Sequence, residues 1–118
     1  MKYMMLIYSS PASWAALTDE DRERMWHEHG ALHAELVASG EWTGGNALAG
    51  PERTTTVRVR DGQVLATDGP FAEVKEHLAG YDVVECATYE RAVEIASRIP
   101  DAQITRIEIR PIINPGEE

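Results

Sequence analysis

The sequence predicts one α+β domain in which a mainly antiparallel sheet carries two helices on the same face. Two observations support this fold class. Apolar residues recur at helical spacing in residues 19–39 and 89–99, whereas they alternate or run together in the intervening segments. The segments follow one another as strand, helix, strand, hairpin, strand, helix and strand. This order is typical of a ferredoxin-like sandwich, here with an extra β-hairpin.

The composition limits the class of protein. The 118 residues are assigned to a single domain, residues 1–118, and 43% of them are apolar. The formal net charge of −9 argues against binding to nucleic acid or to an anionic membrane surface. No apolar run approaches the ~18 residues of a membrane span, and the run after Lys2 is too short for a signal peptide. With Cys86 alone and no nucleotide- or zinc-binding motif, we expect a cytoplasmic protein without metal or cofactor.

The chain opens with a strand and a long helix. Residues 3–8 form a continuous apolar run, which is typical of a strand covered on both faces. Thr18, followed by three acids, starts the helix, and Gly40 ends it. A domain of this size rarely covers both faces of its own sheet, so the first strand predicts a second subunit.

The remaining strands surround a hairpin signal. Residues 44–48 read as a strand with a closely approached or flexible middle at Gly44-Gly45. Residues 54–60 and 63–67 alternate on either side of Asp61-Gly62, a type I′ turn signal. The other expected elements are a strand over residues 80–86, a helix from Thr88 to Pro100 and a strand over residues 103–110.

The sheet face opposite the helices is predicted to be closed by a second copy. It would carry half of the first strand's apolar side chains together with Arg58, Arg106, Glu108 and Arg110. A mixed face of this kind is usually covered in a two-fold dimer whose sheets face each other. Its arginines are either a charged face paired across the dimer or a wall that binds a carboxylate or phosphate.

His29 is the first candidate for chemistry. At about 100° per residue it lies within about 60° of the apolar residues Met25, Leu32 and Leu36, whereas His27 points about 160° away. His29 is therefore buried or lines a cleft. It is either a satisfied core residue or a general acid/base whose carboxylate partner comes from elsewhere in the fold.

Asp68 is the second candidate. It ends a strand, precedes Gly69-Pro70 and lies beside the aromatic Phe71. An aspartate in this place caps its own turn, and a shielded carboxylate at a strand end also serves as a base or orients a histidine. We therefore predict an acid/base pair of His29 and Asp68 that binds no metal.

The same central stretch carries a family resemblance. Residues Asp68-Gly69-Pro70-Phe71-Ala72-Glu73, with Lys75-Glu76 and Gly80-Tyr81 after them, resemble the signature of DGPF-domain proteins within the YCII-related superfamily. The resemblance extends to Lys2-Tyr3-Met4 and Leu6-Ile7-Tyr8 at the start and to residues 107–111 at the close. It implies a ferredoxin-like fold paired into a dimeric α+β barrel.

The resemblance also implies a His–Asp active site. In the superfamily the histidine lies eleven residues before the glycine that ends the first helix, the place that His29 has before Gly40. The superfamily's aspartate follows that helix closely, whereas residues 43–46 contain no acid, so either Asp68 replaces it or the pair is absent. Some relatives act as lyases on aromatic ring compounds, and many members lie beside extracytoplasmic-function sigma factors in bacterial genomes.

Two functions are consistent with these observations. The first is a cofactor-free lyase, isomerase or hydrolase that acts on a small anionic organic molecule in the dimer cleft. His29 and Asp68 would be catalytic, and the substrate would contact Tyr8, Trp42, Phe71, Arg58 and Arg106. The alternative is a non-catalytic small-molecule-binding or regulatory accessory protein, linked to a sigma factor through the resemblance.

Overall fold

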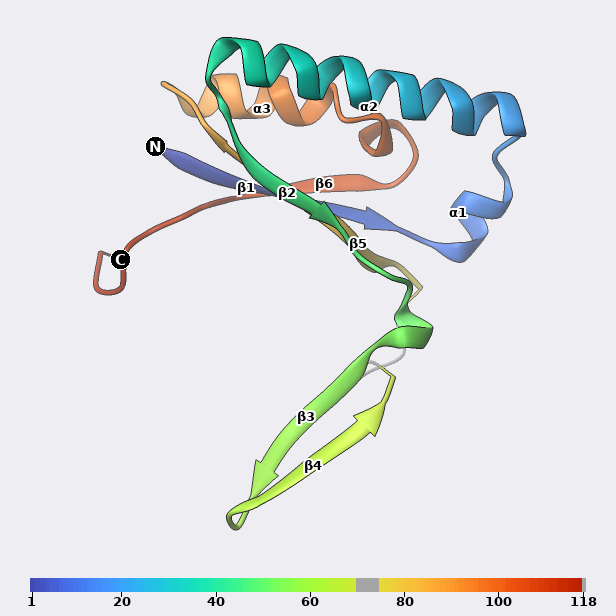
Figure 1. Cartoon of the computed structure of the whole chain (residues 1–118), viewed down its shortest axis with the longest axis vertical. Helices are drawn as coiled ribbons and strands as arrows, with labels where there is room; N and C mark the ends of the chain where they lie inside the picture. The colour runs from blue at the N-terminus through green and yellow to red at the C-terminus, as the bar shows by residue number, and fades with distance from the viewer. Residues whose placement is uncertain (70–74, 118) are drawn as a thin grey trace.

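The computed structural model of the chain describes residues 1–69 and 75–117. Within them, a four-stranded antiparallel sheet has the order β2-β5-β1-β6, and α2 and α3 cover the same face of it (Figure 1). The sheet strands are β1 (Lys2–Ser9), β2 (Trp42–Ala47), β5 (His77–Glu85) and β6 (Arg106–Pro111). The helices are α1 (Pro11–Ala15), α2 (Asp19–Ser39) and α3 (Tyr89–Ser97), with short 3-10 turns η1 (Pro51–Arg53) and η2 (Pro100–Gln103). This α+β arrangement confirms the predicted fold class and is compatible with a ferredoxin-like sandwich.

The ends of α2 are those that the sequence predicts. The Thr18 hydroxyl accepts a hydrogen bond from the Asp21 amide at 3.0 Å, and the Asp21 carboxylate accepts one from the Thr18 amide at the same distance. This reciprocal capping box satisfies two backbone donors at the start of the helix. Gly40 ends the helix in the left-handed conformation, with φ of 80°.

The core lies between the helices and one face of the sheet. Side chains along β1 alternate between buried and half-buried, so every second residue of its apolar run faces the helices. The core cluster of buried residues, from β1, α2, β5, α3 and the segments next to them, comprises Tyr3, Met5, Ile7, Leu32, Leu36, Val84, Cys86, Ala92, Ile95, Ala96 and Ile99. No helix among the described residues is both long enough and apolar enough to cross a membrane.

The predicted hairpin is present and stands apart from the main sheet. Strands β3 (Thr55–Arg60) and β4 (Gln63–Asp68) form a two-stranded sheet that projects away from the helices (Figure 1). Asp61 and Gly62 both have positive φ, 50° and 76°, as a type I′ turn requires. Because Arg58 belongs to β3, the expectation that it shares one sheet face with Arg106 and Arg110 is wrong.

An ion pair ties the start of β2 to α3. The Arg91 guanidinium donates two hydrogen bonds to the Glu41 carboxylate, at 2.9 and 2.7 Å, and the Ser39 hydroxyl donates a third at 2.8 Å. Both charged side chains are largely buried, with 16% of Glu41 and 25% of Arg91 exposed. These hydrogen bonds from Arg91 and Ser39 lower the pKa of Glu41 from 4.5 to about 2.

Replacing Glu41 with glutamine is expected to lower the free energy of unfolding by about 1 to 2 kcal/mol at pH 7. Because folding depresses the pKa of Glu41, its contribution is complete above pH 4.5 and is lost as the pH falls towards 2. Urea unfolding of both proteins across this range should show the difference shrinking with acid. Glu94→Gln is the matched control, since Glu94 also contacts Arg91 but is 61% exposed. A difference that stays constant with pH would contradict the assignment.

Candidate functional site

His29 is paired with Asp101. The His29 Nε2 atom lies 2.8 Å from the Asp101 Oδ1 atom, and the two side chains are 39% and 17% exposed. His29 comes from the middle of α2, and Asp101 follows Pro100 in the turn η2. The Asp101 carbonyl accepts backbone hydrogen bonds from Ile104 and Thr105, which hold this turn closed and present its carboxylate to α2.

A second carboxylate, that of Asp82, lies near the histidine. Asp82 sits on β5 opposite Met5 of β1, so it belongs to the sheet face that packs against the helices. The hydrogen bond to Asp101 raises the pKa of His29 above 6.5; burial opposes this rise, and the charges of Asp101 and Asp82 add to it. Burial also raises the pKa of Asp82. The histidine is therefore held as a cation over a wider pH range than a free imidazole.

The His29–Asp101 pair lines a cavity of about 650 Å³. Its volume is within the range of small-molecule sites, about 300 to 1,000 Å³. Residues from seven elements of the fold form its walls, including Trp14 of α1, Glu52 of η1 and His77 of β5. Apolar walls with a few convergent polar groups are the usual composition of an organic ligand site.

The structure does not pair Asp68 with His29 within the chain. Asp68 is exposed at the end of β4, opposite Thr55 at the base of the hairpin. The backbone amide of the next residue, Gly69, donates to the Thr54 carbonyl at 2.7 Å, which closes the hairpin there. The catalytic role of Asp68 stays a prediction, and Phe71 lies outside the described residues.

The other predicted contact residues are divided between separate cavities. Tyr8 and Arg106 line one of about 520 Å³, which shares His77 with the larger cavity. The Arg106 guanidinium lies 4.1 Å from the centre of the Tyr8 ring and forms ion pairs with Glu76 and Glu108. Because these two glutamates compensate its charge, Arg106 is less suited to bind an anion than the sequence predicts.

Trp42 lines a third cavity, of about 310 Å³, which has His29 in its wall as well. Its ring stands edge-on to the His33 ring, with centroids 4.6 Å apart and an angle of 84°. Arg58 lies on the hairpin, in β3, and lines none of these cavities. The structure therefore brings Trp42 and His29 together, and it places Arg58 elsewhere.

Sequence reasoning missed both acids near His29. Asp82 was the acid that the sequence could have indicated. It is flanked by Tyr81 and Val83 in an otherwise apolar strand, and an acid in such a strand usually has a polar or charged partner. Asp101 carried almost no such signal, since an acid after the proline that ends a helix is common in turns. Asp101 reaches His29 only because η2 packs against α2, and this packing cannot be read from the local sequence.

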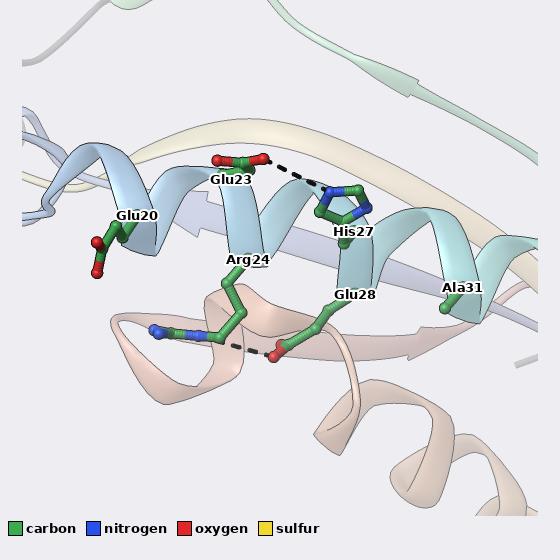
Figure 2. Close-up of a pocket in the computed structure, with 6 residues that line it drawn as sticks. All are labelled: Glu20, Glu23, Arg24, His27, Glu28 and Ala31. Carbon is green, nitrogen blue, oxygen red and sulfur yellow. Dashed lines mark ion pairs between the residues drawn. The ribbon is translucent and has the colours of Figure 1, made fainter.

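A hollow on the outer side of α2 does not qualify as a site. It is lined by Glu20, Glu23, Arg24, His27, Glu28 and Ala31, all from one helix (Figure 2). Two ion pairs within the helix, His27–Glu23 at 3.9 Å and Arg24–Glu28 at 3.8 Å, join four of its five ionisable side chains. Among residues 1–69 and 75–117, no three His, Cys, Asp or Glu side chains gather as a metal site would require.

Comparison with known proteins identifies the family of the chain. Residues 1–115 match the YCII-related domain family. An uncharacterized protein of Rhizobium meliloti (strain 1021) is 30% identical over 121 residues, an alignment that covers 99% of this chain and 98% of that protein. With nearly its whole length matched, and with the motifs of residues 68–81 and both termini in place, the chain belongs to the YCII-related family.

Proposed function

We propose that the protein is an acid/base catalyst, a cofactor-free lyase, isomerase or hydrolase for a small organic molecule, with His29 and Asp101 as its working pair. The observation that carries this proposal is the 2.8 Å contact between the two side chains in the wall of a 650 Å³ cavity. A histidine oriented by a carboxylate is the usual arrangement for moving a proton to or from a bound substrate. In this proposal Asp101 orients the His29 imidazole, a role predicted from the sequence for Asp68.

The pair would act through the two nitrogens of the imidazole. Because Nε2 bonds to Asp101, Nδ1 is left to exchange a proton with the bound molecule. The raised pKa of His29 extends to higher pH the range in which it can donate a proton, and Asp101 stabilises the imidazolium before the proton leaves. Proton donation to an oxygen leaving group or to a carbonyl is the step that this arrangement performs best.

The charges around the cavity favour an uncharged or cationic substrate over the anionic one predicted from the sequence. Glu52 and Asp101 line the cavity, and Asp82 lies beside His29. The arginine predicted to attract an anion, Arg106, is neutralised by two glutamates. An anion entering here would meet more carboxylates than free cations, at a cost in electrostatic energy.

The test of the pair is the titration of His29 followed by NMR of its imidazole protons. The wild-type pKa should lie above 6.5, and Asp101→Asn should lower it, because the group that favours the imidazolium is lost. Asp19→Asn, which removes an exposed acid at the start of the same helix, is the matched control and should leave the pKa of His29 in place. Equal values in wild type and Asp101→Asn would remove the basis of the proposal.

Turnover decides between this function and the alternative of a small-molecule-binding accessory protein. A screen of small aromatic compounds should find one that stabilises the protein and is converted by it. His29→Gln should then retain binding and lose conversion by at least about a hundredfold. Binding without conversion by the wild-type protein would establish the accessory function instead.

The active form is proposed to be a two-fold dimer. One face of the hairpin carries Val57, Val59 and Val64, which are 59%, 66% and 70% exposed. An isolated two-stranded hairpin is marginally stable in water, and exposed apolar side chains on both of its strands add to that cost. The sheet face that the helices do not cover also carries apolar side chains, those of Met4, Leu6 and Tyr8, which are half-buried. A second copy of the chain would cover both this face and the hairpin.

A further inference from the structure

We propose that the 310 Å³ cavity beside His29 binds a planar aromatic group bearing a protonated nitrogen, as in an arylamidine or arylalkylamine. The residues around it are Trp26, His29, Gly30, His33, Trp42 and Asp82. His29 separates this cavity from the larger one that holds Asp101, because it lines both. The two cavities share the His29 side chain, and binding in the smaller one does not require turnover.

Asp82 supplies the anionic end of this cavity. It is half-buried on the sheet face that packs against the helices, an environment in which an ionised carboxylate needs a partner. None of the described residues donates a hydrogen bond to it, its oxygens are open towards the cavity rather than fully enclosed, and the positive charges that act on it are those of His29 and His33 when protonated. A ligand N–H⁺ group in the cavity would complete the carboxylate's hydrogen bonding.

The backbone of β2 is shaped around this carboxylate. A Cβ atom on Gly45 would lie 2.5 Å from Asp82 Oδ1, 2.7 Å from the Tyr81 carbonyl and 2.8 Å from the Trp42 ring. Such distances are shorter than real Cβ contacts, so only glycine fits here. The close approach sets the Asp82 carboxylate and the Trp42 indole next to each other at the floor of the cavity.

On the helix side of the cavity, α2 carries a glycine, Gly30, at a position where a larger residue would be accommodated. Trp26, Gly30 and His33 follow one another at helical spacing on one face of α2. Gly30 lies in the middle of the 21-residue helix, where glycine is unfavourable, and a Cβ atom there would meet nothing within 4 Å. Neither backbone conformation nor contact with the described residues requires glycine at this place. Its absent side chain leaves room between Trp26 and His33.

The aromatic residues identify the other half of the ligand. The Trp26 side chain is 78% exposed, an unusual position for the largest apolar side chain. Indole faces attract cations and stack on planar rings, and two indoles beside a carboxylate are the usual environment of an organic cation. A flat ring with a charged nitrogen satisfies Trp26, Trp42 and Asp82 together.

The first experiment is a titration of the ¹⁵N-labelled protein with benzamidine, followed through the three tryptophan indole N–H signals. The signals of Trp26 and Trp42 should move together with one dissociation constant, and that of Trp14, which lines the larger cavity, should stay. Benzoate, of the same shape but opposite charge, should move neither. Movement of no indole, movement of Trp14 alone, or equal effects of benzoate and benzamidine would overturn the proposal.

Variants separate this site from the acid/base pair. Gly30→Leu should abolish the benzamidine shifts by filling the cavity while raising the melting temperature, since leucine is the better helix former. Ala31→Leu, one residue along on the exposed side seen in Figure 2, is the matched control and should bind as wild type. Asp82→Asn should weaken binding by about tenfold or more. Asp101→Asn should not weaken binding, because it lowers the pKa of His29 and so reduces the positive charge beside the ligand. Failure of the catalytic proposal and failure of this one are therefore distinguishable, and unaltered binding by Gly30→Leu would refute this one.

Discussion

Replacing Val59 and Val64 with aspartate is expected to convert the proposed dimer into a monomer whose main sheet remains folded. These residues are paired across the hairpin and expose 66% and 70% of their surface. Each chain would then have to bury two carboxylates without partners in an apolar interface, at a cost on the order of several kcal/mol for each carboxylate. Light scattering after size-exclusion chromatography should show the mass fall by half, with an unchanged circular dichroism spectrum of the helices.

The opposite side of the hairpin provides the control. Leu65 pairs with Arg58 and points away from the Val57–Val59–Val64 face, so Leu65→Asp should leave the mass of the dimer unchanged. A wild-type protein that already elutes with the mass of one chain would refute the dimer outright. Dissociation by Leu65→Asp but not by the valine variant would place the interface on the other face.

Gly45→Ala is expected to lower the free energy of unfolding by about 2 to 3 kcal/mol, in the upper part of the range for overpacked sites. The new methyl group would meet the Tyr81 carbonyl at 2.7 Å, and backbone cannot move aside as a flexible side chain can. Because the same methyl group meets Asp82 Oδ1 at 2.5 Å, the carboxylate should be displaced and the pKa of His29 should fall. Urea unfolding measures the first effect, and NMR titration of His29 measures the second.

The adjacent glycine is a matched control. A Cβ atom on Gly44 meets nothing within 4 Å, and its φ is not positive. Gly44→Ala should therefore change the stability by less than about 0.5 kcal/mol or increase it slightly, through the lower entropy of the unfolded chain. Similar losses in both variants would show that general strand disruption, rather than contact with Asp82 and Tyr81, is responsible.

Local chemistry explains why most of the fold was predictable. The capping box at Thr18, the left-handed Gly40 and the Asp61-Gly62 turn each act within a few residues, and all three appear where the sequence places them. The continuous apolar run of β1 correctly indicated a strand with apolar groups on both faces. Arg58 was misplaced because alternation shows which side of a strand a residue takes, and it cannot show which sheet the strand joins.

In the candidate site, the position of His29 was predictable from the sequence, whereas its partner was not. The position of His29 on the apolar stripe of α2 correctly indicated a half-buried side chain at a cavity. Its partner could not be found this way, because Asp101 is 72 residues away along the chain and reaches His29 only through the packing of η2. The most conspicuous acid, Asp68, is conspicuous because of its turn, and a turn signal carries no information on long-range contacts.

The connection between β2 and β5 has a consequence for how this protein can change. Ala47 pairs with Gly80, and the Leu48 amide bonds to the Ala79 carbonyl, so the chain leaves the sheet and returns to it at one point. The hairpin is therefore an insertion between β2 and β5 that contributes no strand to the main sheet. It can be lengthened, shortened or replaced without changing the pairing of the sheet strands. Its first residues, including Gly50 and Glu52, form a wall of the large cavity, whereas His29 and Asp101 stand on the permanent scaffold. Changes in this connection would therefore alter the wall of the large cavity and leave the proposed acid/base pair in place.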